Sequence, residues 1–167
     1  MRYASIRNLD ISNGEGVGVS LFVQGCPFRC YNCFNPETWD FKGGKEWTSE
    51  VEDMFIELAS RPYIKRISLL GGECLADENL ADVLNLVNKI RLLLPQKTIW
   101  IYTGYTWEQC LEHQIRKEIV TICDVLVDGE YIDSQRDITL KWRGSSNQRV
   151  INIQKTLATN KIILHSD

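Results

Sequence analysis

Apolar and polar residues alternate between Gly16 and Gly25, and this period of two predicts a strand with one face turned inward. Short apolar runs of similar length recur along the rest of the chain. We predict further strands over residues 65–70, 98–102, 123–127 and 149–153, with a small additional strand over residues 162–164.

Between these strands, apolar residues recur at intervals of three and four, which predicts amphipathic helices. Two of the helices begin at a residue pair that can form a capping box, in which side chains satisfy the first free backbone N–H groups. These pairs are Ser49 with Glu52 and Thr106 with Gln109. The predicted helices cover residues 51–58, residues 80–90 with Pro95 closing the end, and residues 107–115.

The repeated order of strand, helix and strand predicts an α/β fold with a mostly parallel sheet and helices outside it. An eight-unit barrel needs about 250 residues, and this chain has 167. We therefore expect residues 1–167 to form a single domain shaped as an open, partial (β/α) barrel.

Composition and charge narrow the class of protein. The net charge is −3 without a block of Lys or Arg, which argues against nucleic acid as the main partner. No apolar run approaches the roughly 20 residues of a membrane span, and the first residues lack the apolar core of a signal peptide. We expect a cytoplasmic protein without a membrane partner, in which the six cysteines are ligands or buried thiols and not disulfides.

Three of the cysteines, Cys26, Cys30 and Cys33, fall in the loop that follows the first predicted strand. Their sulfurs can turn toward one point, and thiolates select zinc, cuprous copper or iron–sulfur centres. A structural zinc site takes four ligands, whereas no fourth Cys or His is near, because His113 and His165 are distant in sequence. Three sulfurs on a four-iron cube leave one iron open to a small molecule with amino and carboxylate groups.

The three cysteines also leave two other classes of protein open. An electron carrier would hold its cluster with four cysteines, and a zinc-binding interaction module would be colourless.

Other motifs also follow predicted strands. They are the cysteine loop, the turns at residues 71–73 and 103–105, and the pair Asp128–Gly129. Because ligands bind at the carboxyl ends of parallel strands, we expect all of these turns at one edge of the sheet. The glycine-rich run from Gly14 to Gly18 precedes a strand and not a helix, so we interpret it as a flexible turn and not as a phosphate loop.

The spacing Cys-x-x-x-Cys-x-x-Cys after a strand resembles the signature of the radical S-adenosylmethionine (radical SAM) enzymes. The flanking stretches Gln24–Pro27 and Cys33–Trp39 resemble the activating component of anaerobic, class III ribonucleoside-triphosphate reductase. One departure is that many radical SAM loops carry an aromatic residue directly before the third cysteine, whereas here Asn32 stands there and Tyr31 comes one place earlier.

The resemblance implies a 4Fe-4S cluster on the three cysteines and S-adenosylmethionine as the second cofactor. Gly71, Gly72 and Glu73 resemble the family's Gly-Gly-Glu motif, whose backbone and carboxylate hold the amino end of S-adenosylmethionine. The family usually continues with Pro, and this chain has Cys74, which we interpret as a buried side chain and not as a fourth ligand.

Weaker candidates come from the later strands. Thr103 and Asp128 are candidate contacts to the nucleoside or to the methionine carboxylate, although Asp128–Gly129 also fits an ordinary turn. Ser146 and Asn147 belong to a Ser-Ser-Asn-Gln-Arg segment that resembles one in the family and could hold ribose hydroxyls or a carboxylate; a solvated loop is the alternative. Near the loop, Trp39, Phe41 and Trp47 either shield the cluster from water, line a groove for the partner, or pack in the core.

The function implied by the resemblance is reductive cleavage of S-adenosylmethionine followed by removal of a hydrogen from a glycine of the large reductase subunit. A flavodoxin-like protein would supply the electron. The alternative is a radical SAM enzyme that acts on another glycyl-radical enzyme or on a small molecule. In either case we expect no acid–base residue set, because the cofactors carry the chemistry.

Overall fold

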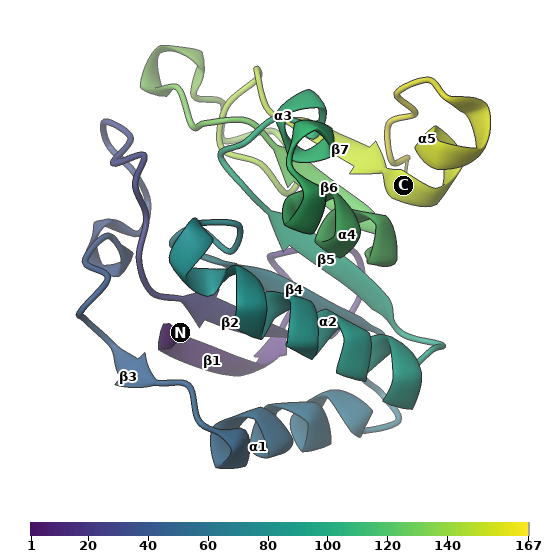
Figure 1. Cartoon of the computed structure of the whole chain (residues 1–167). Coiled ribbons are helices and arrows are strands. Elements are labelled where there is room, and N and C mark those ends of the chain that lie inside the picture. The colour runs from purple at the N-terminus through teal and green to yellow at the C-terminus, as the bar shows by residue number, and fades with distance from the viewer. Residues whose placement is uncertain (167) are drawn as a thin grey trace.

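The fold is a seven-stranded sheet with five α-helices, seen in a computed structural model that describes residues 1–166 (Figure 1). The strands are β1 (Arg2–Asp10), β2 (Gly18–Val23), β3 (Lys45–Glu46), β4 (Arg66–Gly71), β5 (Thr98–Tyr102), β6 (Val125–Asp128) and β7 (Arg149–Asn152). The helices are α1 (Ser49–Ser60), α2 (Leu80–Leu93), α3 (Trp107–Glu112), α4 (Gln114–Ile122) and α5 (Ile153–Thr159). Short 3-10 turns cover Pro36–Thr38, Asp77–Asn79 and Asp133–Gln135.

The strand order is β3-β1-β2-β4-β5-β6-β7. Strands β2, β4, β5 and β6 are parallel, as predicted. The edges are antiparallel, because β1 pairs with β2, β3 with β1, and β7 with β6. The four parallel strands thus bring their carboxyl ends to one edge of the sheet.

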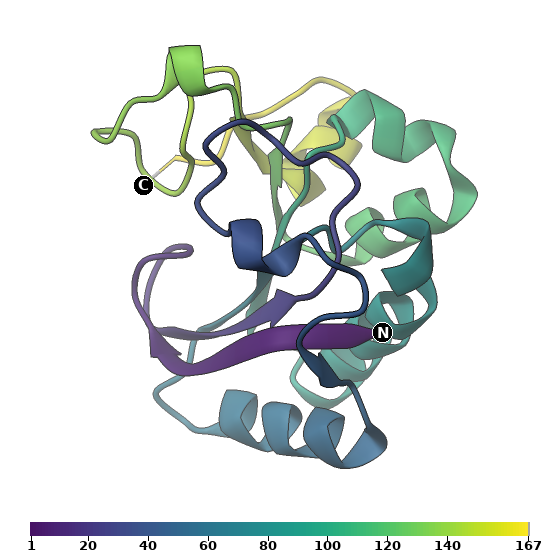
Figure 2. The same cartoon turned by 90° about the vertical axis from the view of Figure 1, so that its left-hand side faces the viewer.

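The main hydrophobic core lies between one face of the sheet and the helices. Alternate residues of the parallel strands, such as Val19, Leu21 and Leu69, pack there against buried residues from α1, α2, α4 and α5. Figure 2 shows α2, α3 and α4 on one side of the strands, whereas the loops of residues 11–17 and 130–148 lie on the other side. That second face holds only a small cluster around Trp100 and Val127, so it is free to line a cavity.

Several predicted boundaries were wrong. The N-cap of α1 is Thr48, whose Oγ1 accepts a hydrogen bond from Val51 N at 3.2 Å, and Ser49 is already helical. Glu52 is therefore not part of a capping box; its carboxylate accepts a hydrogen bond from Trp47 Nε1. The extra strand predicted over residues 162–164 is only an isolated bridge between Ile151 and Leu164.

The third predicted helix begins as expected and then breaks. Thr106 and Gln109 form the predicted capping box at the start of α3. His113 interrupts the helix, and its ring nitrogen accepts from Arg116 N to start α4. Strand β1 and helix α5 had no counterpart among the predicted elements.

Candidate metal and ligand site

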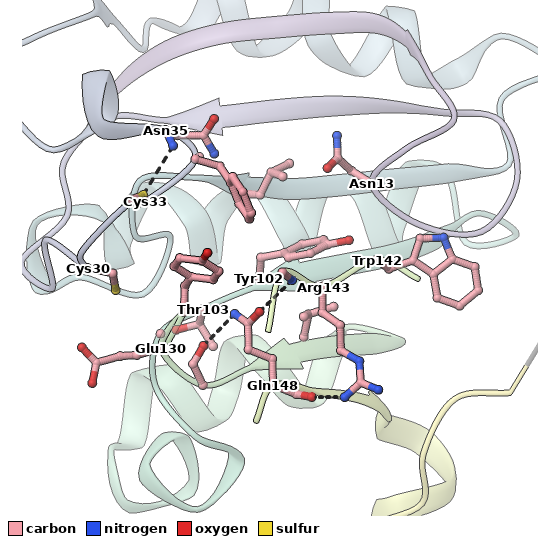
Figure 3. Close-up of a pocket in the computed structure, with 18 of the residues that line it drawn as sticks. Asn13, Cys30, Cys33, Asn35, Tyr102, Thr103, Glu130, Trp142, Arg143 and Gln148 are labelled. Atoms are coloured by element: carbon pink, nitrogen blue, oxygen red, sulfur yellow. Dashed lines mark hydrogen bonds between the residues drawn. The ribbon is translucent and has the colours of Figure 1, made fainter. Parts of the chain in front are cut away.

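A cavity of about 560 Å³ lies on the helix-free face, at the carboxyl ends of the parallel strands. Phe22, Leu70, Tyr102 and Val127 form its floor, one from each parallel strand. The three loop cysteines line the same cavity. Figure 3 shows Cys30 and Cys33 at one end and Asn13 and Trp142 at the other. The volume lies in the range of about 300–1,000 Å³ that is typical of small-molecule sites.

The cysteine loop folds back on itself after β2. Gly25 N donates to Thr38 O at 2.7 Å and Cys26 N to Trp39 O at 3.1 Å, so the two ends of the loop are tied together. Arg29 and Asn32 have positive φ values of 50° and 55°, which turn the chain on both sides of Cys30. This backbone keeps all three cysteines partly exposed on the cavity wall.

Two phenylalanines fasten the cysteine loop to the opposite loops. Phe28 packs on Tyr105, with ring centroids 4.8 Å apart, and a Cβ at Gly104 would lie only 2.6 Å from the Phe28 ring. Phe34 packs on Tyr131 at 4.9 Å. The loop is thus held by the turn after β5 and by the segment after β6, so three strand ends are connected around the cavity.

The donor set on the cavity wall fits an iron–sulfur cluster better than zinc. Within residues 1–166, no group of three or more His, Cys, Asp or Glu side chains lies close enough to hold a single metal ion. Of the Cys and His residues in this described range, the three loop cysteines are the ones that line the cavity. Burial raises the pKa of Cys26 to about 11, so its thiolate needs a cationic centre. Three thiols without a fourth ligand are the set that leaves one iron open.

Gly71 and Gly72 let the end of β4 lie against the end of β2 and the start of the cysteine loop. Gly71 has a φ of +112°, and a Cβ there would be 2.6 Å from Val23 N. A Cβ on Gly72 would be 2.6 Å from Gly25 O. Side chains at either position would push the strand end away from the loop, so both glycines have a packing reason in this structure.

Glu73 presents a buried carboxylate to the cavity. It accepts hydrogen bonds from Gly104 N at 2.7 Å, Thr103 Oγ1 at 2.7 Å and Leu75 N at 2.9 Å. Burial raises the pKa of Glu73, and these hydrogen bonds oppose the rise. The result is a carboxylate whose position is fixed and which can receive the amino group of a ligand.

Of the two candidates after the later strands, the structure brings only Thr103 to the cavity, where it also supports Glu73. Asp128 is buried and is not part of the cavity wall. Its carboxylate accepts from Trp107 N at 2.7 Å and pairs with Arg149, with Nη2 and Oδ2 2.5 Å apart. Asp128 therefore links β6, α3 and β7.

Ser146 and Asn147 are not on the cavity wall. Ser146 is exposed, whereas Asn147 is half-buried and its side-chain oxygen is buried without a hydrogen-bond partner among the described residues. Ser146 Oγ donates to Gln135 Oε1 at 3.3 Å, and Asn147 Nδ2 donates to Glu130 O at 2.8 Å. The neighbouring Gln148 lines the cavity instead, and its Oε1 accepts from Gly144 N at 2.9 Å (Figure 3). The same sequence segment thus contributes to the site, but through a different residue.

Cys74 is completely buried in the main core, and its sulfur lies 3.8 Å from Leu70 O. It is not on the cavity wall, in agreement with its interpretation as a buried side chain. Trp47 is also a core residue, packed on Tyr3 and Phe55. Phe41 packs on the backbone of Gly25, and the indole N–H of Trp39 is buried without a hydrogen-bond partner in the described part of the chain.

Sequence reasoning missed much of the wall, including Tyr102 and Arg143. Tyr102 belongs to a predicted strand, and the period of two could have placed it on the face opposite to Ile99 and Ile101. Arg143 follows Trp142 in a polar loop, where no periodic pattern indicates which side chains turn inward.

Comparison with known proteins gives two kinds of match. Residues 12–151 match the family model described as a 4Fe-4S single cluster domain. The anaerobic ribonucleoside-triphosphate reductase-activating protein of Escherichia coli (strain K12) is 40% identical over 156 residues, which are 92% of this chain and 100% of that protein.

Two further relatives carry the same name. That of Vibrio cholerae serotype O1 is 40% identical over 89% of this chain and 96% of its own length. That of Enterobacteria phage T4 is 35% identical over 90% of this chain and 93% of its own length. The similarity therefore extends over nearly the whole of each protein.

Proposed function

This chain belongs to the family of anaerobic ribonucleoside-triphosphate reductase-activating proteins, and we propose that it is a radical SAM activase that installs a glycyl radical in an anaerobic ribonucleotide reductase. The observation that carries this proposal is that three free thiols and the fixed carboxylate of Glu73 line one cavity. The three thiols suit a cluster with an open iron, and the Glu73 carboxylate suits the amino end of S-adenosylmethionine.

In this proposal, Cys26, Cys30 and Cys33 hold the cluster. Glu73 receives the amino group of S-adenosylmethionine, and Thr103 and Gly104 orient that carboxylate through their hydrogen bonds to it. Gly71 and Gly72 keep the backbone close to the cofactor. Asp128, Ser146 and Asn147 would support the loops around the nucleoside. Asp128 ties β6 to α3, and Ser146 and Asn147 tie their loop to the segment that follows β6.

Cys26, Cys30 and Cys33 would hold a reduced cluster that would supply the electron for reductive cleavage of S-adenosylmethionine, and this radical chemistry would remove a hydrogen atom from a glycine of the reductase. The side chains on the cavity floor, Phe22, Leu70 and Val127, are apolar and exclude water from this reaction.

We further propose that the sheet is an open partial barrel of the radical SAM type and that residues 1–167 form one domain. The placement of buried helix residues in one core on one face of the sheet supports both statements. The described residues 1–166 contain no helix that is long and apolar enough to cross a membrane. The protein would act in the cytoplasm, with the large reductase subunit as its partner and a flavodoxin-like protein as electron donor.

Anaerobic reconstitution with iron and sulfide, followed by electron paramagnetic resonance, tests the proposed function. We expect a brown protein whose reduced-cluster spectrum changes when S-adenosylmethionine is added. Mixing with the large reductase subunit should then give a glycyl-radical signal. A spectrum that S-adenosylmethionine leaves unaltered, or zinc in place of iron, would refute the proposal.

A further inference from the structure

One hydroxyl on the cavity wall has no hydrogen-bond partner. The Tyr102 hydroxyl oxygen is buried and has no partner among the described residues. Arg66, a charged group that acts on Tyr102, is already engaged by backbone carbonyls, including Asp10 O at 2.6 Å and Asn13 O at 3.0 Å. An unpaired buried hydroxyl costs stability, so such groups in proteins usually have a water or ligand as partner.

The Tyr102 hydroxyl also points to one end of the cavity. Figure 3 shows it directed away from Cys30 and Cys33, toward the end where Asn13 and Trp142 lie. Burial raises the pKa of Tyr102, so the phenol stays neutral and offers a hydrogen-bond donor at pH 7. A ligand with a hydrogen-bond acceptor, such as a carbonyl oxygen, at the end of the cavity remote from the cysteines would satisfy this donor.

Asn13 offers the complementary group at the same end. Its Nδ2 donates to Asp10 Oδ2 at 2.6 Å, which fixes the orientation of the carboxamide. The side-chain oxygen of Asn13 accepts no hydrogen bond from the described residues, and Asn13 lines the cavity. A donor and an acceptor on the wall at the same end of the cavity match the carbonyl and N–H groups of a peptide backbone.

The floor between these groups and the cysteines also suits a peptide. Phe22, Leu70, Tyr102 and Val127 lie in one row across neighbouring parallel strands, since Phe22 pairs with Leu70 and Tyr102 with Val127. Apart from the Tyr102 hydroxyl, this row offers only apolar surface to a ligand. An extended chain with small side chains can cross such a floor and hydrogen-bond only at its end.

We propose that the Tyr102 hydroxyl and the Asn13 side-chain oxygen bind a peptide unit of the partner's glycine-bearing segment and so position the glycine near the cofactor end of the cavity. This inference rests on the proposed function. Tyr102 and Asn13 are then the residues that hold the protein substrate, whereas the cysteines and Glu73 hold the cofactors.

The test compares Tyr102→Phe with wild type, both with the cluster reconstituted. A matched control is Tyr63→Phe, which removes the same atom from an exposed tyrosine outside the cavity. Isothermal titration under argon measures the affinity for the large reductase subunit in the presence of S-adenosylmethionine, and a second titration measures the affinity for S-adenosylmethionine alone. Glycyl-radical formation at varied subunit concentration gives the half-saturating concentration.

We expect Tyr102→Phe to weaken binding of the large subunit and to raise its half-saturating concentration by about fivefold, the effect of one lost neutral hydrogen bond. The affinity for S-adenosylmethionine should stay within about twofold of wild type, and Tyr63→Phe should match wild type in both titrations. The urea midpoint of Tyr102→Phe should be equal to or above that of wild type, because the variant no longer buries an unpaired hydroxyl.

Other outcomes overturn the inference in distinguishable ways. A loss of affinity for S-adenosylmethionine with unchanged subunit binding would assign the hydroxyl to the nucleoside. A lowered urea midpoint would assign it to the fold, and no change in either affinity would leave it without a ligand. If wild type itself formed no glycyl radical, the proposed function would fail, and this inference would fail with it.

Discussion

At the scale of single residues, the six cysteines divide into two groups by their surroundings. Cys26, Cys30 and Cys33 are partly exposed on one loop, whereas Cys74, Cys110 and Cys123 are fully buried in the main core. Burial raises the pKa of Cys110 to about 12, and the pKa of Cys74 lies well above its ordinary value for the same reason. The buried thiols therefore stay protonated and act as small apolar side chains.

This division predicts opposite effects of two cysteine substitutions. Cys30→Ser should lower the affinity for the cluster by about tenfold or more, because it removes a direct ligand. Even residues that only hydrogen-bond to the ligands of a metal site change the affinity by about tenfold when they are substituted. Cys74→Ala should retain the iron content of wild type and lose about 1 kcal/mol of stability through its smaller side chain. Iron and sulfide analysis after anaerobic reconstitution measures both, and iron loss in Cys74→Ala would mean that its thiol is a ligand after all.

The sequence was sufficient to bring together residues that belong to local motifs. The cysteine spacing and Gly71–Glu73 pointed to one site, and both line the same cavity. Residues whose role depends on which face of a strand or loop they occupy were harder to assign. Tyr102 was counted only as part of a strand, and Ser146 and Asn147 were selected although their neighbour Gln148 turns inward.

At the scale of elements, the turn between β1 and β2 is organised around one buried guanidinium. Arg66 of β4 is completely buried and donates to the carbonyl oxygens of Asp10, Asn13, Glu15 and Gly16. A Cβ on Gly14 would lie 2.3 Å from the Arg66 side chain. The glycine-rich run is thus a turn, as predicted, and it contains glycine because the chain wraps closely around Arg66.

Asp10 balances this buried charge and predicts a pH dependence. Burial alone would raise the pKa of Asp10, but hydrogen bonds from Ser20, Asn13 and Ser12, together with Arg66, lower it below its ordinary value of 3.8. A lowered carboxyl pKa stabilises the folded protein at pH values above 3.8, and this contribution is lost as the pH falls through the lower folded value.

We therefore expect Asp10→Asn to lower the free energy of unfolding by about 2 kcal/mol above about pH 5, and the difference from wild type to shrink below pH 3.8. Urea unfolding at several pH values measures it. Asp53→Asn, at an exposed position of α1, controls for the change in net charge. A difference that stays constant with pH would show that the charge of Asp10 does not contribute.

The elements that the sequence did not predict have a common property. Strand β1 is mostly exposed or half-buried along its length, so its apolar residues do not alternate regularly. Helix α5 has only seven residues, too few to show a helical period. The parallel strands are buried on both faces and were predicted with small errors at their ends.

At the scale of the whole molecule, the helices cover one face of the sheet and leave the other face available for binding. The core places the helices on one face, and the loops on the other face surround the cavity (Figure 2). The alternation of strands and helices was enough to predict parallel strands with the site at their carboxyl ends. It could not predict the antiparallel strands at the two edges of the sheet. These strands, β1, β3 and β7, pair with neighbours in a direction that no local sequence pattern encodes.

The open cavity predicts that the partner protein controls the reaction. In the proposed function, S-adenosylmethionine cleavage by the activase alone should be slow or uncoupled, because the partner completes the cavity wall. We expect the large subunit to accelerate formation of 5′-deoxyadenosine by at least about tenfold, which needs only about 1.4 kcal/mol of transition-state stabilisation. Chromatographic assay of 5′-deoxyadenosine with and without the subunit measures this ratio, and equally rapid, sustained cleavage without it would contradict the expectation.

The buried Arg66 also affects the shape of the cavity. By holding residues 10–16 across the amino ends of the strands, it makes Ser12 and Asn13 the end wall of the cavity. With this wall in place, a smaller part of the cavity is open to solvent and oxygen. A single docked protein could then seal it, and one arginine far from the iron would help to protect a short-lived radical from quenching.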